Sequence, residues 1–83
     1  MKYSVVWSSE AERQLTQLWL GSRMRSEIAN AANEIDAMLA QNPHECGESR
    51  DATRRVVLTY PLGVIIDISD LDRLVRVLSI WSF

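Results

Sequence analysis

Residues Thr53 to Phe83 read TRRVVLTYPLGVIIDISDLDRLVRVLSIWSF, a pattern that predicts three consecutive β-strands separated by two short turns. We expect the strands at Arg54–Thr59, Leu62–Ser69 and Arg73–Trp81. Proline and glycine mark the first turn, and Ser and Asp side chains that bond their own backbone mark the second. Val, Ile and Leu stand at adjacent positions instead of alternating strictly with polar residues. This indicates a sheet that is covered on both faces or paired centrally.

The N-terminal residues Lys2–Trp7 predict a further strand at the outside of the sheet. β-Branched and aromatic residues recur here at period two, so Tyr3, Val5 and Trp7 would share one side.

Two helices are expected between this strand and the C-terminal sheet. Ser9 and Glu12 match a capping box, and Gly21 is the expected left-handed stop of the first helix. Ser22 would cap the second helix, which should end before Pro43. The apolar stripe of the second helix consists of Met24, Ile28, Ala31, Ala32, Ile35, Met38 and Leu39.

The predicted order is therefore β-α-α-β-β-β, an α+β fold. The junction Gly21-Ser22 is short, so the helices should form a tight antiparallel hairpin that covers one sheet face. Residues Asn42–Ala52 are expected to be a long loop leading back to the sheet. The first strand is expected to join an antiparallel sheet of four strands.

Composition agrees with one domain, residues 1–83. The chain is 47% hydrophobic and 24% charged, as in globular proteins, and its net charge of −2 (pI ≈ 5.2) provides no global basic field for nucleic acid. No apolar run approaches the roughly 20 residues of a membrane span, and the N-terminus lacks a signal-peptide core. We therefore expect a cytoplasmic protein that does not associate with a membrane.

The residues predict neither a cofactor nor a metal ion. The three glycines are isolated, so no phosphate-cradling loop is formed, and the single His44 has no second histidine at ligand spacing. The single Cys46 cannot form an internal disulfide, which fits a reducing compartment.

Arginine residues cluster in and beside the expected sheet, and the planar guanidinium group binds phosphate and carboxylate equally well. Arg73 lies at the start of the last expected strand. The candidate site residues are Arg50, Arg54, Arg55 and Arg76, with His44 or Glu48 as a base. In the alternative reading, the arginines form surface ion pairs with Asp51, Asp67, Asp70 and Asp72.

The aromatic residues also allow two readings. Trp7, Trp19 and Trp81 are expected to pack in the core or at its rim, and the alternative is stacking on a base or a partner side chain. Trp81 and Phe83 form an apolar C-terminus, which can dock on its own domain or on another chain.

The element order resembles the RelE/ParE superfamily of small toxins from bacterial type II toxin–antitoxin and plasmid-stabilisation systems. The segments that carry the resemblance are KYSVVWSSEAERQL at the start, NPHECGESR in the loop and VVLTYPLGVIIDISDLDRLVRVLSIW at the end. The resemblance covers essentially the whole chain, and it depends on the order and spacing of these segments.

The resemblance implies a toxin that a cognate antitoxin neutralises, with either of two activities. Some members cleave messenger RNA on the ribosome, and others inhibit DNA gyrase. The nucleases use basic residues on the sheet and after its last strand. Here Arg54 suits one such position, but Gly63 stands where an arginine is expected. Ser82 and Phe83 stand where a terminal basic residue is expected, and no tyrosine follows.

This depleted cation set favours a ParE-like toxin that binds DNA gyrase, or a catalytically degenerate one, and therefore a protein that is not an enzyme. The first alternative is a RelE-like ribosome-dependent endoribonuclease, which would engage ribosome and mRNA. The second alternative is a non-toxic module that only binds a partner. A homodimer and a heteromeric complex both stay open, because the apolar edge strand Lys2–Trp7 could pair with either. Replacing Arg54 and Arg55 by alanine is expected to weaken whichever activity exists.

Overall fold

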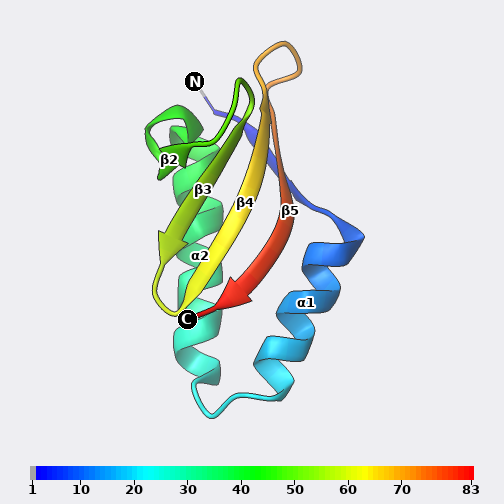
Figure 1. The fold of residues 1–83 in the computed structure, drawn as a ribbon, viewed down its shortest axis with the longest axis vertical. Helices are drawn as coiled ribbons and strands as arrows, with labels where there is room; N and C mark the ends of the chain where they lie inside the picture. Colours follow the sequence, from blue (N-terminus) through cyan, green and yellow to red (C-terminus); the bar gives the residue numbers. More distant parts are fainter. Residues whose placement is uncertain (1) are drawn as a thin grey trace.

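The computed structural model describes residues 2–83 and confirms the α+β class (Figure 1). In chain order, its elements are β1 (Ser4–Trp7), α1 (Ser9–Leu20), α2 (Arg25–Gln41), the 3-10 turn η1 (Pro43–Glu45), β2 (Glu48–Ser49), β3 (Arg54–Thr59), β4 (Leu62–Ser69) and β5 (Leu74–Ser82). The bounds predicted for β3 and β4 are confirmed to the residue.

The sheet has five strands in the order β1-β5-β4-β3-β2. The three C-terminal strands form the predicted antiparallel meander, but β1 pairs parallel to β5, with Ser4 opposite Leu74 and Trp7 opposite Val77. The expectation of four antiparallel strands is therefore wrong in both count and direction. A short turn forces two strands to be antiparallel, whereas β1 and β5 are separated by most of the chain and have no such constraint.

The fifth strand comes from the segment that was expected to be a loop. The segment 42–52 contains η1 and then β2, which pairs with β3 through Glu48 opposite Val56 and Ser49 opposite Arg55. Gly47 makes the turn into β2 with a positive φ of 59°. An L side chain rarely adopts this conformation, so the glycine permits the return to the sheet.

Both helices lie on one face of the sheet, as predicted, and the opposite face is left open (Figure 1). The details of the helix ends differ from the expectation. Ser8, and not Ser9, caps α1, because its side chain accepts the backbone N–H of Ala11 at 3.0 Å. Gly21 ends α1 with an ordinary φ of −87°. The connection spans residues 21–24, and Ser22 bonds the amide of Met24 before α2 begins.

The core lies between α2 and the sheet. One stripe of α2 is fully buried, as the spacing predicted, and it packs on the inward side chains of the central strands. The buried apolar residues are Ala11, Ile28, Ala31, Ile35, Leu39, Val57, Leu62, Val64, Ile66, Ile68, Val75, Val77 and Ile80. Tyr3, Val5 and Trp7 of the β1 region pack against this core from one side, as expected.

A register shift bends β5 where α1 crosses it. Ile65 lies opposite Ser79, but the next residue, Ile66, lies opposite Val77, so β5 carries one extra residue. Side chains from the α1 region bond the backbone here: Gln14 Oε1 accepts the amide of Ile80 at 2.9 Å, and Ser8 Oγ donates to the carbonyl of Leu78.

Two strand ends fall short of the prediction. Arg73 was expected to begin the last strand, but it adopts a left-handed φ of 52° in the turn, so β5 begins at Leu74. β1 begins at Ser4 instead of Lys2. In the described range 2–83, no helix combines the length and apolar character needed to cross a membrane.

Candidate functional site

The open face of the sheet carries a row of charged side chains. Ile66 and Ile68 are buried under the helices, so Asp67 between them points to the open face. The same alternation places Arg54 of β3 and Arg76 of β5 on this face. Register brings the three together, with Arg54 opposite Asp67 and Asp67 opposite Arg76. We call Arg54, Asp67 and Arg76 the charged row.

The two arginines of the charged row form no ion pair within residues 2–83. The carboxylate of Asp67 accepts a hydrogen bond from Thr53 Oγ1 at 2.6 Å, and that of Asp51 accepts the backbone amides of Thr53 and Arg54. The acids are thus satisfied by other donors. For the described residues, the alternative in which the arginines form ion pairs with Asp51, Asp67, Asp70 and Asp72 is therefore wrong.

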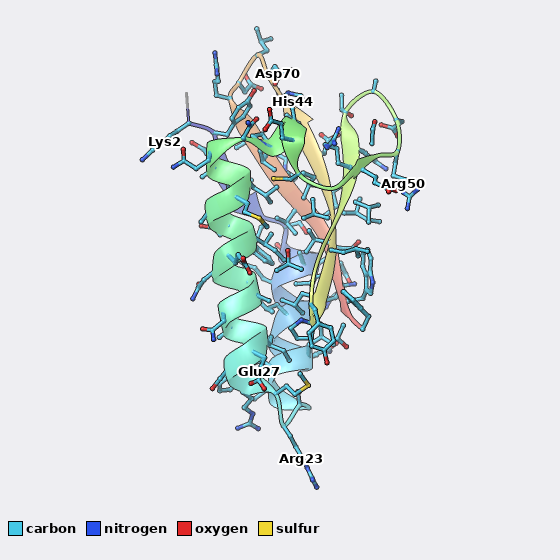
Figure 2. All side chains as sticks on the ribbon, turned by 90° about the vertical axis from the view of Figure 1, so that its left-hand side faces the viewer. Lys2, Arg23, Glu27, His44, Arg50 and Asp70 are labelled. Carbon is cyan, nitrogen blue, oxygen red and sulfur yellow. The ribbon has the colours of Figure 1, made fainter. Side chains whose placement is uncertain are left out.

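Glu48 and Arg50 extend this face toward the β2 edge. Glu48 lies directly opposite Val56 of the open face, and paired residues of adjacent strands share a face. Figure 2 shows Arg50 on the side of the sheet away from α2. A shallow hollow of about 210 Å³ lies here, lined by Gly47, Glu48, Arg50, Val56 and Leu58. The structure therefore brings the candidates Glu48, Arg50, Arg54 and Arg76 to one face.

Arg55 and His44, the other two candidates, lie elsewhere. Arg55 follows Arg54 in β3, so its side chain points to the opposite side. It donates from Nε to the carbonyl of Cys46 at 2.7 Å and from Nη2 to that of Gly47 at 3.1 Å. These bonds hold the segment before β2 against β3, so Arg55 acts as a structural residue.

An indole covers the end of the open face that lies away from the charged row. Trp81 of β5 lies opposite Gly63 of β4, and a Cβ atom added to Gly63 would lie 2.5 Å from Trp81 Cε2. The glycine thus allows the indole to lie directly on the strand. This is the position where the family resemblance implied an arginine in the nucleases, and here it is occupied by an apolar ring.

Other large apolar side chains are also exposed at this end of the sheet. The ring of Phe83 meets that of Tyr60 edge to face with centroids 5.6 Å apart, and the Phe83 amide bonds the carbonyl of Pro61. Tyr60 is 64% exposed and Phe83 54%, so both rings are still largely open to solvent. We call Leu58, Tyr60, Trp81 and Phe83 the apolar patch.

A second polar cluster joins β1, η1 and the turn after β4. Asp70 Oδ1 accepts a hydrogen bond from Tyr3 OH at 2.7 Å and lies 2.6 Å from His44 Nε2 (Figure 2). The guanidinium of Arg73 lies 5.5 Å from the centre of the Tyr3 ring. Sequence reasoning missed Tyr3 as a site residue, because 67 positions separate it from Asp70 and no local pattern links them.

Hydrogen bonding shifts the pKa values of Asp70 and Tyr3 in this cluster. The bond from His44, and then that from Tyr3, lowers the pKa of Asp70, since both favour the carboxylate. The bond to the Asp70 carboxylate in turn raises the pKa of Tyr3. The arrangement orients His44 but separates it from the charged row, so the expected use of His44 as a base for the arginines is not supported by this geometry.

Other reactive groups are sparse. Burial raises the pKa of the Cys46 thiol, and the protonated form is the weaker nucleophile. Across the described residues, no three His, Cys, Asp or Glu side chains gather in a way that could hold a metal ion. The chemistry of the open face therefore consists of guanidinium groups, carboxylates and the apolar patch.

Several solved structures have a fold similar to that of this chain. The RelBE2 toxin–antitoxin complex of Mycobacterium tuberculosis has a chain that matches with a TM-score of 0.83 and 17% identity, covering 100% of this chain and 93% of that chain. The ParDE system of P. aeruginosa matches with a TM-score of 0.69 and 12% identity, covering 98% and 96%. TrmO from Pseudomonas aeruginosa matches with a TM-score of 0.66 and 28% identity over 98% of this chain, but over 36% of that chain.

No protein-family model matches the sequence, and no curated protein matches it either. In fold, the chain is similar to the toxin–antitoxin proteins of the RelBE2 and ParDE structures. The resemblance seen in the sequence is confirmed at the level of the fold.

Proposed function

We propose that this protein is the toxin of a bacterial type II toxin–antitoxin system and that it acts in the cytoplasm by binding a target through its open face. The observation that carries this proposal is Trp81 lying on Gly63. Phosphoryl transfer without a metal needs preorganised cations around the reacting phosphate. The indole on this face provides a surface for binding but no such charge. DNA gyrase is the target that we propose, by analogy with the ParE group of this fold.

A second function is favoured by a different observation. Glu48, Arg50, Arg54 and Arg76 share the open face, which is the composition of a metal-free RNase site with a carboxylate base and guanidinium groups around the phosphate. Ribosome-dependent mRNA cleavage is therefore the alternative activity. A chain that has lost toxicity and only binds a partner is the third.

The proposed partner in the resting state is an antitoxin. A groove between α1 and α2, on the side away from the sheet, offers two adjoining hollows of about 420 and 330 Å³. Its floor is apolar and its rim includes Glu12 and Asp36, which suits an apolar segment with basic flanks. The residues shared by the two hollows are Leu15, Thr16, Ala32 and Asn33.

The test combines induced expression in a bacterial host, primer extension on abundant messages and a gyrase supercoiling assay with the purified chain. We expect growth arrest, intact messages and lost supercoiling. Trp81→Ala should abolish the effect, whereas Trp19→Ala should retain it, because Trp19 is similarly exposed but lies on α1 away from the open face. Thermal unfolding of both variants separates lost binding from lost folding.

Two results would overturn the proposal. Cuts at fixed codon positions, lost on Glu48→Gln, would establish the RNase alternative instead. Harmless overexpression of the folded chain would leave a partner-binding module.

A further inference from the structure

The open face has two ends of different chemistry at a fixed separation. Arg54 and Leu58 both point to this face from β3, four residues apart. At about 3.3 Å per residue, the charged row and the apolar patch are about 13 Å apart. Between them lie Val56 and Ile65, which are half-buried and give the face an apolar middle.

The guanidinium groups at one end lack partners within residues 2–83. Arg54 and Arg76 are exposed and form no ion pair, although Asp67 stands between them in register. Each guanidinium group has five N–H donors, and this arrangement suits a carboxylate supplied by another molecule. The row runs positive, negative, positive across three strands, so its complement carries two acids separated by a hydrogen-bond donor.

The apolar end lacks a cover. Leu58 is 60% exposed and Trp81 37%, and they flank Gly63 in one register row. Aromatic side chains that are exposed together are typical of the centre of an interface, where they contribute most of the binding free energy. A large apolar side chain of a partner would remove them from water.

We infer that the open face binds a protein segment with carboxylates at one end and a large apolar side chain about 13 Å away. This inference rests on the proposed function, for which it states the chemistry of the target segment. The two carboxylates on the face itself, Asp67 and Glu48, favour protein over nucleic acid, because a continuous phosphate backbone would lie against both. A peptide can place a neutral or basic residue opposite each of them.

A short synthetic peptide in extended conformation is the probe that tests this inference. It carries Glu and, four residues later, Trp, which an extended chain places on one side about 13 Å apart, and the two control peptides carry Gln for Glu or Ala for Trp. Binding to the isotopically labelled protein is followed by NMR. We expect shifts at β3, β4 and β5 and weaker binding of both control peptides.

Matched protein variants locate the contact. The double change Arg54→Ala with Arg76→Ala should weaken binding about fivefold, since exposed ion pairs are individually modest. Arg13→Ala is the control, because this exposed arginine lies on α1, which covers the opposite face of the sheet. Leu58→Ser should weaken binding, whereas Leu71→Ser, at a 95% exposed turn position, should not.

Each outcome decides the inference. Tighter binding of a single-stranded oligoribonucleotide than of the Glu peptide would overturn it and make the face a nucleic-acid surface. Binding of neither probe, or shifts confined to the helices, would also overturn it. Gyrase inhibition without peptide binding would defeat the inference and leave the proposed function standing. If the peptide binds but expression of the chain is harmless, the inference stands and the proposed function is overturned.

Discussion

His44 Nε2 and Asp70 Oδ1 lie 2.6 Å apart and join η1 to the turn between β4 and β5. Tyr3 OH donates to the same carboxylate oxygen from the start of the chain. One exposed carboxylate therefore links three segments that are distant in sequence, at the end of the sheet opposite the apolar patch. Because the carboxylate must be ionised to accept these bonds, the link should make the stability of the protein depend on pH.

The variant Asp70→Asn tests that dependence. The folded-state pKa of Asp70 is lowered, so its contribution to the free energy of unfolding is present above the ordinary carboxyl pKa of about 3.9 and is lost as pH falls through the lower folded-state value. Urea unfolding should show a wild-type advantage at neutral pH that shrinks below about pH 4. Glu34→Gln, an exposed change on α2, is the control. An advantage that is independent of pH would contradict the assignment.

Gly63 and Trp81 should be energetically coupled. Gly63→Ala alone places a Cβ atom 2.5 Å from the indole, and we expect it to cost about 1–3 kcal/mol as overpacking. In the Trp81→Ala background the same change should cost little, because alanine suits a strand interior better than glycine does. A double-mutant cycle by chemical denaturation measures the difference. Additive effects would show that the indole does not lie on the strand.

Gly47 should resist substitution more than Gly21. Gly47→Ala would strain a positive φ of 59° and place Cβ 1.9 Å from the Val56 carbonyl oxygen, so we expect a loss of about 1–3 kcal/mol. Gly21 has an ordinary φ of −87°, and its added Cβ would lie 3.3 Å from the Gln17 oxygen. Denaturation gives the two losses, and NMR should show weakened pairing of β2 with β3 only in Gly47→Ala.

Arg54 and Arg55 should separate into a functional and a structural residue. Arg55→Ala removes charge-assisted bonds to two backbone carbonyls, so we expect about 1 kcal/mol of lost stability. Arg54→Ala should leave stability within about 0.5 kcal/mol but weaken target binding. Thermal unfolding and the toxicity assay, run on each single variant, distinguish them. A loss of stability in Arg54→Ala alone would reverse these roles.

Ile35 is a fully buried residue of α2 whose truncation should be damaging. Its side chain is 0% exposed in the core, so Ile35→Ala should cost about 2–5 kcal/mol from lost burial and a residual cavity. Leu71→Ala, at the 95% exposed turn, should change stability by less than about 0.5 kcal/mol. Urea denaturation compares the two. Similar losses would mean that α2 does not pack as described.

Much of the C-terminal sheet could be predicted from local chemistry. The bounds of β3 and β4 follow from runs of Val, Ile and Leu that are interrupted by turn-forming residues. The buried stripe of α2 follows from helical spacing. The helix caps could not be placed to the residue, because Ser8 and Ser9 are chemically equivalent and the backbone geometry chooses between them.

The candidate site was predicted by residue type but not by arrangement. Adjacent arginines in a strand must point to opposite faces, so Arg54 and Arg55 could not both belong to one site, but which of them faced the helices depended on the packing of Val57. The parallel pairing of β1, the short strand β2 and the contact between His44 and Asp70 join segments that are distant in sequence.

The sequence by itself thus determined the class of fold, the central strands and the apolar faces, because these depend on patterns within a few residues. The tertiary structure alone decided which charges share the open face, that Trp81 lies on Gly63, and where the chain pairs with itself over long distances. Those relationships depend on register and packing, and no local pattern encodes them.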